Sequence, residues 1–331
     1  MNASCGPDVG FFASPKGLKI SYHLLTAFST PINLLGFYLI VFKSPRQMRT
    51  AKLYILNLHY WIIASEYYIC LFTVPYVLTP ATAGFSLGNL QDLGVPTVVQ
   101  VVIALLLIAY VMFSVAALFE NRFFVVCTFR GKETWAFWRH IWLLAHYVLA
   151  PILFIPFFFW VPDQEEAKKT LFESLPCLPD YIYNAPVFIL TENFQYQLTG
   201  VLSVVGVLFL ETAFFTVSLV RTITKQMSDR KMSQTTVRMQ KMFLFSLLLQ
   251  ITVPLMVFHV PLTWKMIATY GSYYNQCYSN IANLVGSTHG LLSTVVMILV
   301  HRPYRDAFFS MLPIKQATLD SRIVSVVPTQ Y

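Results

Sequence analysis

Side chains able to catalyse a reaction or bind a metal ion are scattered through this sequence and form no recognisable active site. Seven histidines occur, none of them in the HExxH pattern of zinc enzymes. His140 and His146 are six residues apart and share no helix face, and Ser287 and His289 are only two apart. GxSxG, phosphate-loop and dinucleotide motifs are absent as well. The sequence therefore predicts no enzyme, no metal site and no cofactor.

Two carboxylates, Glu66 and Glu211, stand inside long apolar stretches. A charge within a membrane costs free energy, so it marks a functional site or needs an internal partner. On a helix, Glu66 would lie about 20 Å from Leu53, and Glu211 about 15 Å from Arg221. Two interpretations remain open. Either each glutamate lines a pocket or binds an ion, or each is a protonated carboxyl that is hydrogen-bonded inside the protein.

A third pattern, LFENRFF, ends an apolar stretch with Glu120, Asn121 and Arg122. Glu120 and Arg122 are two residues apart and do not face each other on a helix. Arg122 can extend to a membrane interface while its stem stays in apolar surroundings, and Arg238 and Lys241 are candidate partners for Glu120. The group suits a two-state latch that a ligand biases by binding one state better. The alternative is an ordinary charged helix end.

The elements that carry these residues are apolar blocks of about 20 residues, enough to cross roughly 30 Å of hydrocarbon as helix. The chain has 331 residues, of which 56% are hydrophobic and 11% charged, and its mean hydropathy is +0.60. Soluble domains carry about 25% charged residues. The sequence predicts an all-α, seven-transmembrane helix bundle. The expected spans are 20–42, 53–79, 97–126, 141–160, 196–220, 242–266 and 278–300.

Basic residues set the expected orientation, because 18 of the 23 Lys and Arg residues lie in alternate loops and in the tail. The positive-inside rule then places the amino terminus outside and the carboxyl terminus in the cytoplasm. We expect an extracellular segment at 1–19, a membrane domain at 20–300 and a cytoplasmic tail at 301–331. The stretch 16–42 is too long for a signal peptide. Short basic clusters between apolar blocks do not indicate nucleic-acid binding.

The longest outer loop, between the fourth and fifth spans, contains a helix signal. Asp163 can cap a helix that has Glu166 three residues further on, and the LPCLP stretch would end it. We expect a short helix from Gln164 to about Ser174, packed over the extracellular mouth. On the same side, Asn2 begins a triplet that fits N-glycosylation.

The five cysteines separate by side of the membrane. Cys70 lies within a span and Cys127 on the cytoplasmic side, whereas Cys5, Cys177 and Cys277 lie at the outer side, which alone is oxidising. The leading hypothesis is a disulfide between Cys5 and Cys177. A bond between Cys177 and Cys277, or three free thiols, are the alternatives.

Six stretches together resemble, in order and position, the nematode serpentine chemoreceptors of class H. The resemblance covers nearly the whole chain and implies a seven-helix G protein-coupled receptor. Such receptors are thought to lie in the plasma membrane of sensory neurons, in their cilia, and to detect external chemicals through heterotrimeric G proteins. The stretches are NLHYW (57–61), LFENRFF (118–124), PDQEEA (162–167), LPCLPDYIYN (175–184), STHGLLST (287–294) and HRPYR (301–305).

The resemblance assigns a place to the charged triplet. Glu120, Asn121 and Arg122 stand where rhodopsin-like receptors carry an acid-Arg-aromatic triplet that contacts the G protein, although here Asn separates the acid from the Arg. Rhodopsin-like receptors also have a cysteine at the outer end of the third span, which this chain lacks. That departure makes Cys5 the preferred partner for Cys177.

The carboxyl-terminal flank carries the last motif of the resemblance. Tyr304 and Arg305 stand where the seventh span turns into the tail and are assigned to the coupling region. Pro303, followed by Phe308 and Phe309, indicates a short interfacial helix against membrane lipid. A charged flank without a signalling role is the alternative.

With the seven predicted spans, the resemblance to class H receptors implies a chemosensory receptor. We expect an external small molecule to enter between the third, fifth, sixth and seventh spans, under the loop with Cys177. A G protein would then respond at Arg122 and the loop 221–241. The alternative from another class is a membrane carrier or ligand-gated channel that uses Glu66 and Glu211.

Overall fold

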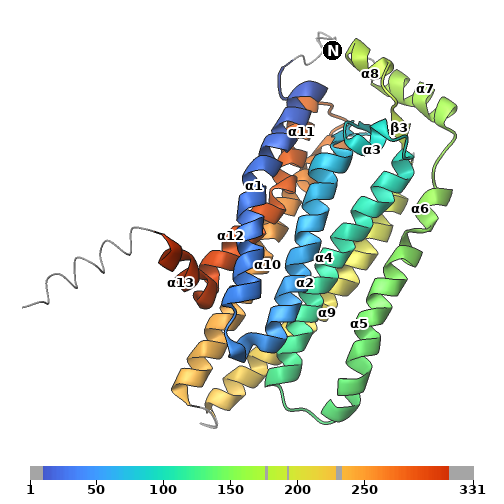
Figure 1. The fold of residues 1–331 in the computed structure, drawn as a ribbon. Helices are drawn as coiled ribbons and strands as arrows, with labels where there is room; N and C mark the ends of the chain where they lie inside the picture. The colour runs from blue at the N-terminus through green and yellow to red at the C-terminus, as the bar shows by residue number, and fades with distance from the viewer. Residues whose placement is uncertain (1–9, 176–177, 192–193, 229–232, 313–331) are drawn as a thin grey trace, which may run out of the picture.

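Seven helical segments form a bundle in the computed structural model, which describes residues 10–175, 178–191, 194–228 and 233–312 (Figure 1). They are α1 (Pro15–Lys43), α2 (Arg49–Tyr67) with the π-helical turn η2 (Tyr68–Thr73), α4 (Thr97–Val126), α5 (Lys132–Phe154), α9 (Phe194–Ser228), α10 (Gln234–Tyr270), and α11 (Gln276–Ser287) with α12 (His289–Val300). By length and composition, five of the described segments could cross a membrane: α1, α4, α5 with its extension, α9, and α11 with α12.

Most helices extend beyond the predicted spans, because the prediction counted apolar residues only. The fourth begins at Lys132 rather than 141, and it is interrupted at Ile155 before the short α6 (Pro156–Phe159). Polar flanks such as these continue a helix outside the hydrocarbon without an apolar signal. The helices are therefore longer than the apolar stretches from which the spans were predicted.

The second predicted span, 53–79, was wrong in its last part. The helix ends at Thr73, because Val74 has a positive φ of 42° and Pro75 follows it. The chain then forms strands β1 (Pro75–Val77) and β2 (Ala83–Ser86), which pair antiparallel, and β2 also pairs with β3 (Phe188–Ile189). This small sheet was not predicted. It covers one end of the bundle, which we call the sheet end.

The loop between α5 and α9 adds two short helices above the sheet end (Figure 1). The helix α7 (Gln164–Ser174) confirms the predicted range, and Asp163 caps it by accepting bonds from two backbone amides of the first turn at 3.0 and 3.1 Å. Gln164 fixes the helix to β3, because its amide donates to Ile189 O and accepts from Ile189 N, both at 3.0 Å. The helix α8 (Asp180–Tyr183) follows.

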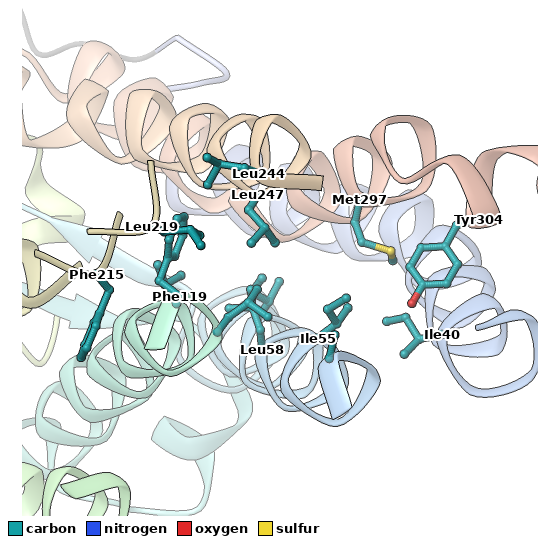
Figure 2. Packing of buried hydrophobic residues seen from close by; sticks show 14 of the residues in the cluster. Ile40, Ile55, Leu58, Phe119, Phe215, Leu219, Leu244, Leu247, Met297 and Tyr304 are labelled. Carbon is teal, nitrogen blue, oxygen red and sulfur yellow. The ribbon is translucent and has the colours of Figure 1, made fainter. Parts of the chain in front are cut away.

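At the opposite end, α13 (Arg302–Met311) turns away from α12, with Pro303 in its first turn. We call this the α13 end. An apolar core lies there, contributed by α1, α2, α4, α9, α10, α12 and α13, and Figure 2 shows Ile40, Ile55, Met297 and Tyr304 converging in it. A cavity of about 790 Å³ lies beside this core, between α4, α5 and α9. Tyr304 is fully buried. The last helix is therefore part of the core.

Three sequence predictions lie outside the described residues. The proposed disulfide between Cys5 and Cys177, its alternative between Cys177 and Cys277, and the glycosylation triplet at Asn2 all involve residues 1–9 or 176–177. They stay predictions.

Candidate functional site

The first candidate site is a buried ionic cluster near the α13 end, where α4 ends. Glu120 is fully buried, and its two carboxylate oxygens accept bonds from Arg139 Nη2 at 2.7 Å and from Trp135 Nε1 at 2.8 Å. The expected partners, Arg238 and Lys241, are exposed at the base of α10. The structure corrects that pairing, because the first turns of α5 pack against the end of α4 and bring Arg139 to the carboxylate.

Arg139 connects this cluster to α2. Its Nη2 atom also lies 3.4 Å from Asn121 Oδ1 and 3.2 Å from the hydroxyl of Tyr54, while its guanidinium carbon lies 4.2 Å from the centre of the Phe124 ring. Removing one partner of a buried ion pair costs about 3–5 kcal/mol, because the other charge stays buried. The pair therefore fixes how α4 and α5 are placed at this end.

Arg122, two residues after Glu120, lies beside the junction of α12 and α13. Burial, with a smaller contribution from the charge of Arg122, lowers the pKa of His301 to about 4. Tyr304 lies 2.9 Å from the Ser44 hydroxyl, at the end of α1, and burial raises its pKa. Arg305 is half-buried and lies 3.9 Å from Asp306. The two charges of LFENRFF thus face different neighbours. Glu120 faces α5, and Arg122 lies near the junction of α12 and α13.

Glu66 belongs to a polar network in the middle of the bundle, between α1, α2 and α12. Its Oε2 atom accepts a bond from Asn33 Nδ2 at 3.1 Å, and Asn33 Oδ1 accepts from the Thr294 hydroxyl at 2.7 Å. His59 Nε2 lies 3.1 Å from Asn33 O. Glu66 is only 1% exposed. This geometry favours the interpretation of a carboxyl hydrogen-bonded inside the bundle over one that lines a pocket.

Two glycines make room for this network. A methyl group on Gly290 would collide with the Glu66 carboxylate, and one on Gly36 would lie 2.6 Å from a methyl carbon of Thr294. Small residues at such positions let helices approach closely. Gly36 and Gly290 are therefore required by contact with neighbouring helices.

Glu211 lies in a different network, on α9 facing α5. His146 Nε2 is 3.1 Å from its Oε2 atom, and Trp142 Nε1 is 3.5 Å from its Oε1 atom. The described residues thus place Glu66 and Glu211 in separate hydrogen-bonded groups, Glu66 with α1 and α12 and Glu211 with α5.

Sequence reasoning missed the partners that α5 supplies. Trp135, Arg139, Trp142 and His146 are spaced by 4, 3 and 4 residues, which puts them on one helix face. All four carry N–H groups, and the structure directs the first two at Glu120 and the last two at Glu211. This spacing indicates a helix that presents hydrogen-bond donors along one face, and these donors pair with Glu120 and Glu211.

The second candidate site is a cavity of about 470 Å³ under the sheet. Each of the four spans expected to hold the ligand contributes to its wall, with Gln100 from α4, Val201 from α9, Phe258 from α10 and Asn283 from α11. The sheet closes it from above, and α1 and η2 add further lining, which the sequence did not indicate. The volume falls within the range of about 300–1,000 Å³ typical of small-molecule sites.

The polar residues that line the cavity come from several elements. Deep in the bundle, the Phe258 ring centre lies 4.5 Å from that of His289, and the Ser287 hydroxyl donates to Tyr22 at 3.4 Å. Near the sheet, Lys265 Nζ donates to Ala81 O at 3.3 Å. Apolar side chains dominate the wall between them. The cavity therefore suits a small, largely apolar molecule.

Comparison with known proteins agrees with this architecture. The chain is 27% identical to serpentine receptor class H-72 of Caenorhabditis elegans over 327 residues, which cover 98% of this chain and 93% of that receptor. The crystal structure of squid rhodopsin shares the fold, with a TM-score of 0.53 at 10% identity, over 98% of this chain and 94% of rhodopsin. A sequence model of the serpentine seven-transmembrane chemoreceptor family Srh matches residues 13–314. The chain therefore belongs to the Srh family of serpentine seven-transmembrane G protein-coupled chemoreceptors.

Proposed function

We propose that this membrane protein is a chemosensory receptor that binds an external small molecule in the cavity at the sheet end and activates a heterotrimeric G protein at the α13 end. One observation carries the proposal. The helix α4 lines the cavity with its first turns, at Gln100 and Val101, and carries Glu120 and Arg122 in its last turns. About 20 residues of helix, roughly 30 Å, connect the two sites.

The orientation follows from charge. The loops and helix ends at the α13 end carry most of the Lys and Arg residues, including the exposed Arg130, Arg238 and Lys241, and such loops stay in the cytoplasm. The sheet end then faces outside, where a chemical stimulus arrives. The same basic surface would contact the G protein and anionic lipid headgroups, and the apolar side chains of α13 would contact the membrane.

Activation requires that the ligand bind one conformation better than the other. In the conformation described here, Arg122 lies beside His301 and Tyr304, and Tyr304 lies against Ser44. Movement of α4 relative to α12 and α13 would change the surroundings of Arg122. We propose that this movement is what the G protein detects.

The test replaces Arg122 by Ala in cells that express the receptor with a G protein reporter. We expect the response to an activating odorant to be lost, while the amount at the cell surface is unchanged, because Arg122 is far from the cavity. Lys169→Ala, which removes an exposed charge of α7 at the sheet end, is the matched control. An undiminished response of Arg122→Ala would count against the latch.

The location is tested separately, with a carboxyl-terminally tagged copy expressed from its own promoter. We expect the tag in the plasma membrane of the cilia of a few sensory neurons. A tag confined to gut or epidermal membranes would contradict a role in detecting external chemicals.

A further inference from the structure

We propose that the ligand of the cavity is a largely apolar alcohol, and that its hydroxyl group binds the side-chain amide of Asn283 on α11. The inference rests on the proposed function only in taking the cavity as the ligand site. It names the chemical class of the ligand and the residue that selects it, which neither the family nor the fold assigns.

The direction of the Asn283 side chain is the first argument. Asn283 lines the cavity and is partly exposed. Residues three and four positions away on a helix share one face, and on either side of Asn283 they are all buried: Ser279, Asn280, Gly286 and Ser287. The exposed Tyr278 and Ile281 lie on the opposite face of α11. The exposed part of Asn283 therefore faces the cavity and not the lipid.

The unused hydrogen-bonding capacity of Asn283 is the second argument. Its backbone oxygen accepts a bond from the Ser287 hydroxyl at 2.9 Å, whereas its side-chain amide has no bond to any residue that the structure describes. The neighbouring Asn280 differs, because it donates to Phe12 O and accepts from Gln276 Nε2, both at 2.8 Å. Asn280 thus holds the fold together, and the amide of Asn283 stays available to a molecule in the cavity.

The surroundings of this amide are the third argument. The walls contributed by the other helices carry apolar side chains, among them Ala104 and Ile108 of α4, Val201 of α9, and Phe258 and Leu262 of α10. A charged head group beside Asn283 would lose its hydration against a neutral amide, at a large cost in free energy. The cavity therefore suits an apolar body with one neutral polar group.

This arrangement selects among neutral ligands of equal size. A hydroxyl group can donate to the amide oxygen and accept from the amide nitrogen, so it can satisfy both parts of Asn283. An ether oxygen can only accept. An alkane can do neither, and its binding would leave the amide cut off from water without a partner. Sites that hydrogen-bond a ligand hydroxyl reject an analogue that lacks it for this reason.

The test measures binding of 1-heptanol, 1-methoxyhexane and octane to the purified receptor in lipid nanodiscs, with empty nanodiscs correcting for membrane partition. The three are linear molecules with the same number of non-hydrogen atoms. We expect the ratio of the octane Kd to the heptanol Kd to fall about tenfold or more in Asn283→Leu, which replaces the amide by an apolar group of similar size. The ratio for 1-methoxyhexane should fall less. Asn89→Leu, which changes an exposed asparagine of α3 (Asn89–Asp92) outside the cavity lining, is the matched control and should leave both ratios unchanged.

Retained octane binding shows that Asn283→Leu is folded, so a loss confined to heptanol supports the inference. A ratio that this variant leaves unchanged, or that Asn89→Leu lowers equally, would overturn it. Should the leucine variant bind none of the three, Asn283→Ala removes the same amide without adding volume, and the same two outcomes apply.

The inference and the proposed function can fail separately. Heptanol binding that depends on Asn283 without G protein activation would refute the receptor role alone. Activation by an odorant whose potency Asn283→Leu leaves unchanged, while Ala104→Phe lowers it, would refute the assignment of Asn283 alone.

Discussion

The two ends of the bundle differ in how they use their buried volume. At the α13 end, helices converge on an apolar core, and each carboxylate oxygen of the buried Glu120 accepts a bond from a donor on α5. A cavity of about 790 Å³ lies beside that core, between α4, α5 and α9. At the sheet end, three short strands and α7 cover a cavity of about 470 Å³. The difference lies in what the buried groups do: at the α13 end an ion pair joins two helices, whereas the sheet covers the cavity in which we propose that the ligand binds. Substitutions at the α13 end should therefore reduce stability, and those under the sheet should reduce binding.

The largest effect should come from breaking the ion pair between Glu120 and Arg139 at the α13 end. Glu120→Ala and Arg139→Ala should each destabilise the receptor by about 3–5 kcal/mol, because each leaves a buried charge without its partner. The double variant should lose less than the sum of the two. Thermal unfolding of the purified receptor measures this, with Arg130→Ala as an exposed control. Single variants as stable as that control would show that the pair does not hold α4 to α5.

The next effect concerns the middle of the bundle, between the two ends. Gly290→Ala should cost about 1–3 kcal/mol, because the added methyl group collides with the Glu66 carboxylate. Gly206→Ala, where a methyl group meets open space on α9, should instead stabilise by about 0.5–1 kcal/mol. Combining Gly290→Ala with Glu66→Ala should relieve the collision, so additive losses would contradict this explanation.

A bulky side chain placed in the cavity at the sheet end should weaken ligand binding without lowering the stability of the receptor. Ala104→Phe puts a ring into the cavity, and we expect the potency of an activating odorant to fall about tenfold or more, which corresponds to about 1.4 kcal/mol. The unfolding temperature should change little. The control is Val207→Phe on α9, a position 55% exposed and outside the cavity lining. An equal loss in both variants would mean that the cavity is not the binding site.

The smallest effect should come from removing the N-cap of α7, the helix above the sheet end. Asp163→Ala removes the cap of α7 and should cost about 1 kcal/mol, whereas Asp163→Asn should keep most of it. Hydrogen exchange at the amides of Glu165 and Glu166, which donate to Asp163, measures the local opening. Unchanged exchange in the Ala variant would show that packing against β3 holds the helix without its cap.

Much of the fold could be predicted from local sequence signals. Apolar blocks of about 20 residues predicted the spans, and Asp163 with Glu166 predicted α7. The sheet was not predicted, because residues 74–79 continue the apolar run of the second span, although Pro75 was an available signal that the helix ends there. Pairing with β3, more than 100 residues later, is a contact that no local pattern records.

The candidate sites show the same limit. The sequence indicated that Glu120 and Glu66 needed partners, yet it assigned Glu120 to α10, whereas α5 supplies Arg139. The spacing of the four N–H donors along α5 could have indicated this helix as the partner of both glutamates. The cavity had no signal at all, since apolar residues that line it and those that face lipid are the same types. Only the packing of the helices separates them.

The contacts of α1 have a consequence for synthesis of the chain. Asn33 bonds Thr294, Ser44 lies against Tyr304, and Asn280 donates to Phe12 O. Helix α1 thus leaves the ribosome well before the residues that complete it, which follow 260 residues later, a delay on the order of tens of seconds at cellular rates of translation. Until then Asn33 lacks that partner within the membrane. A chain cut short before Gln276 would never gain that donor, so the amide oxygen of Asn33 would lack the bond from Thr294 for as long as the shortened chain exists.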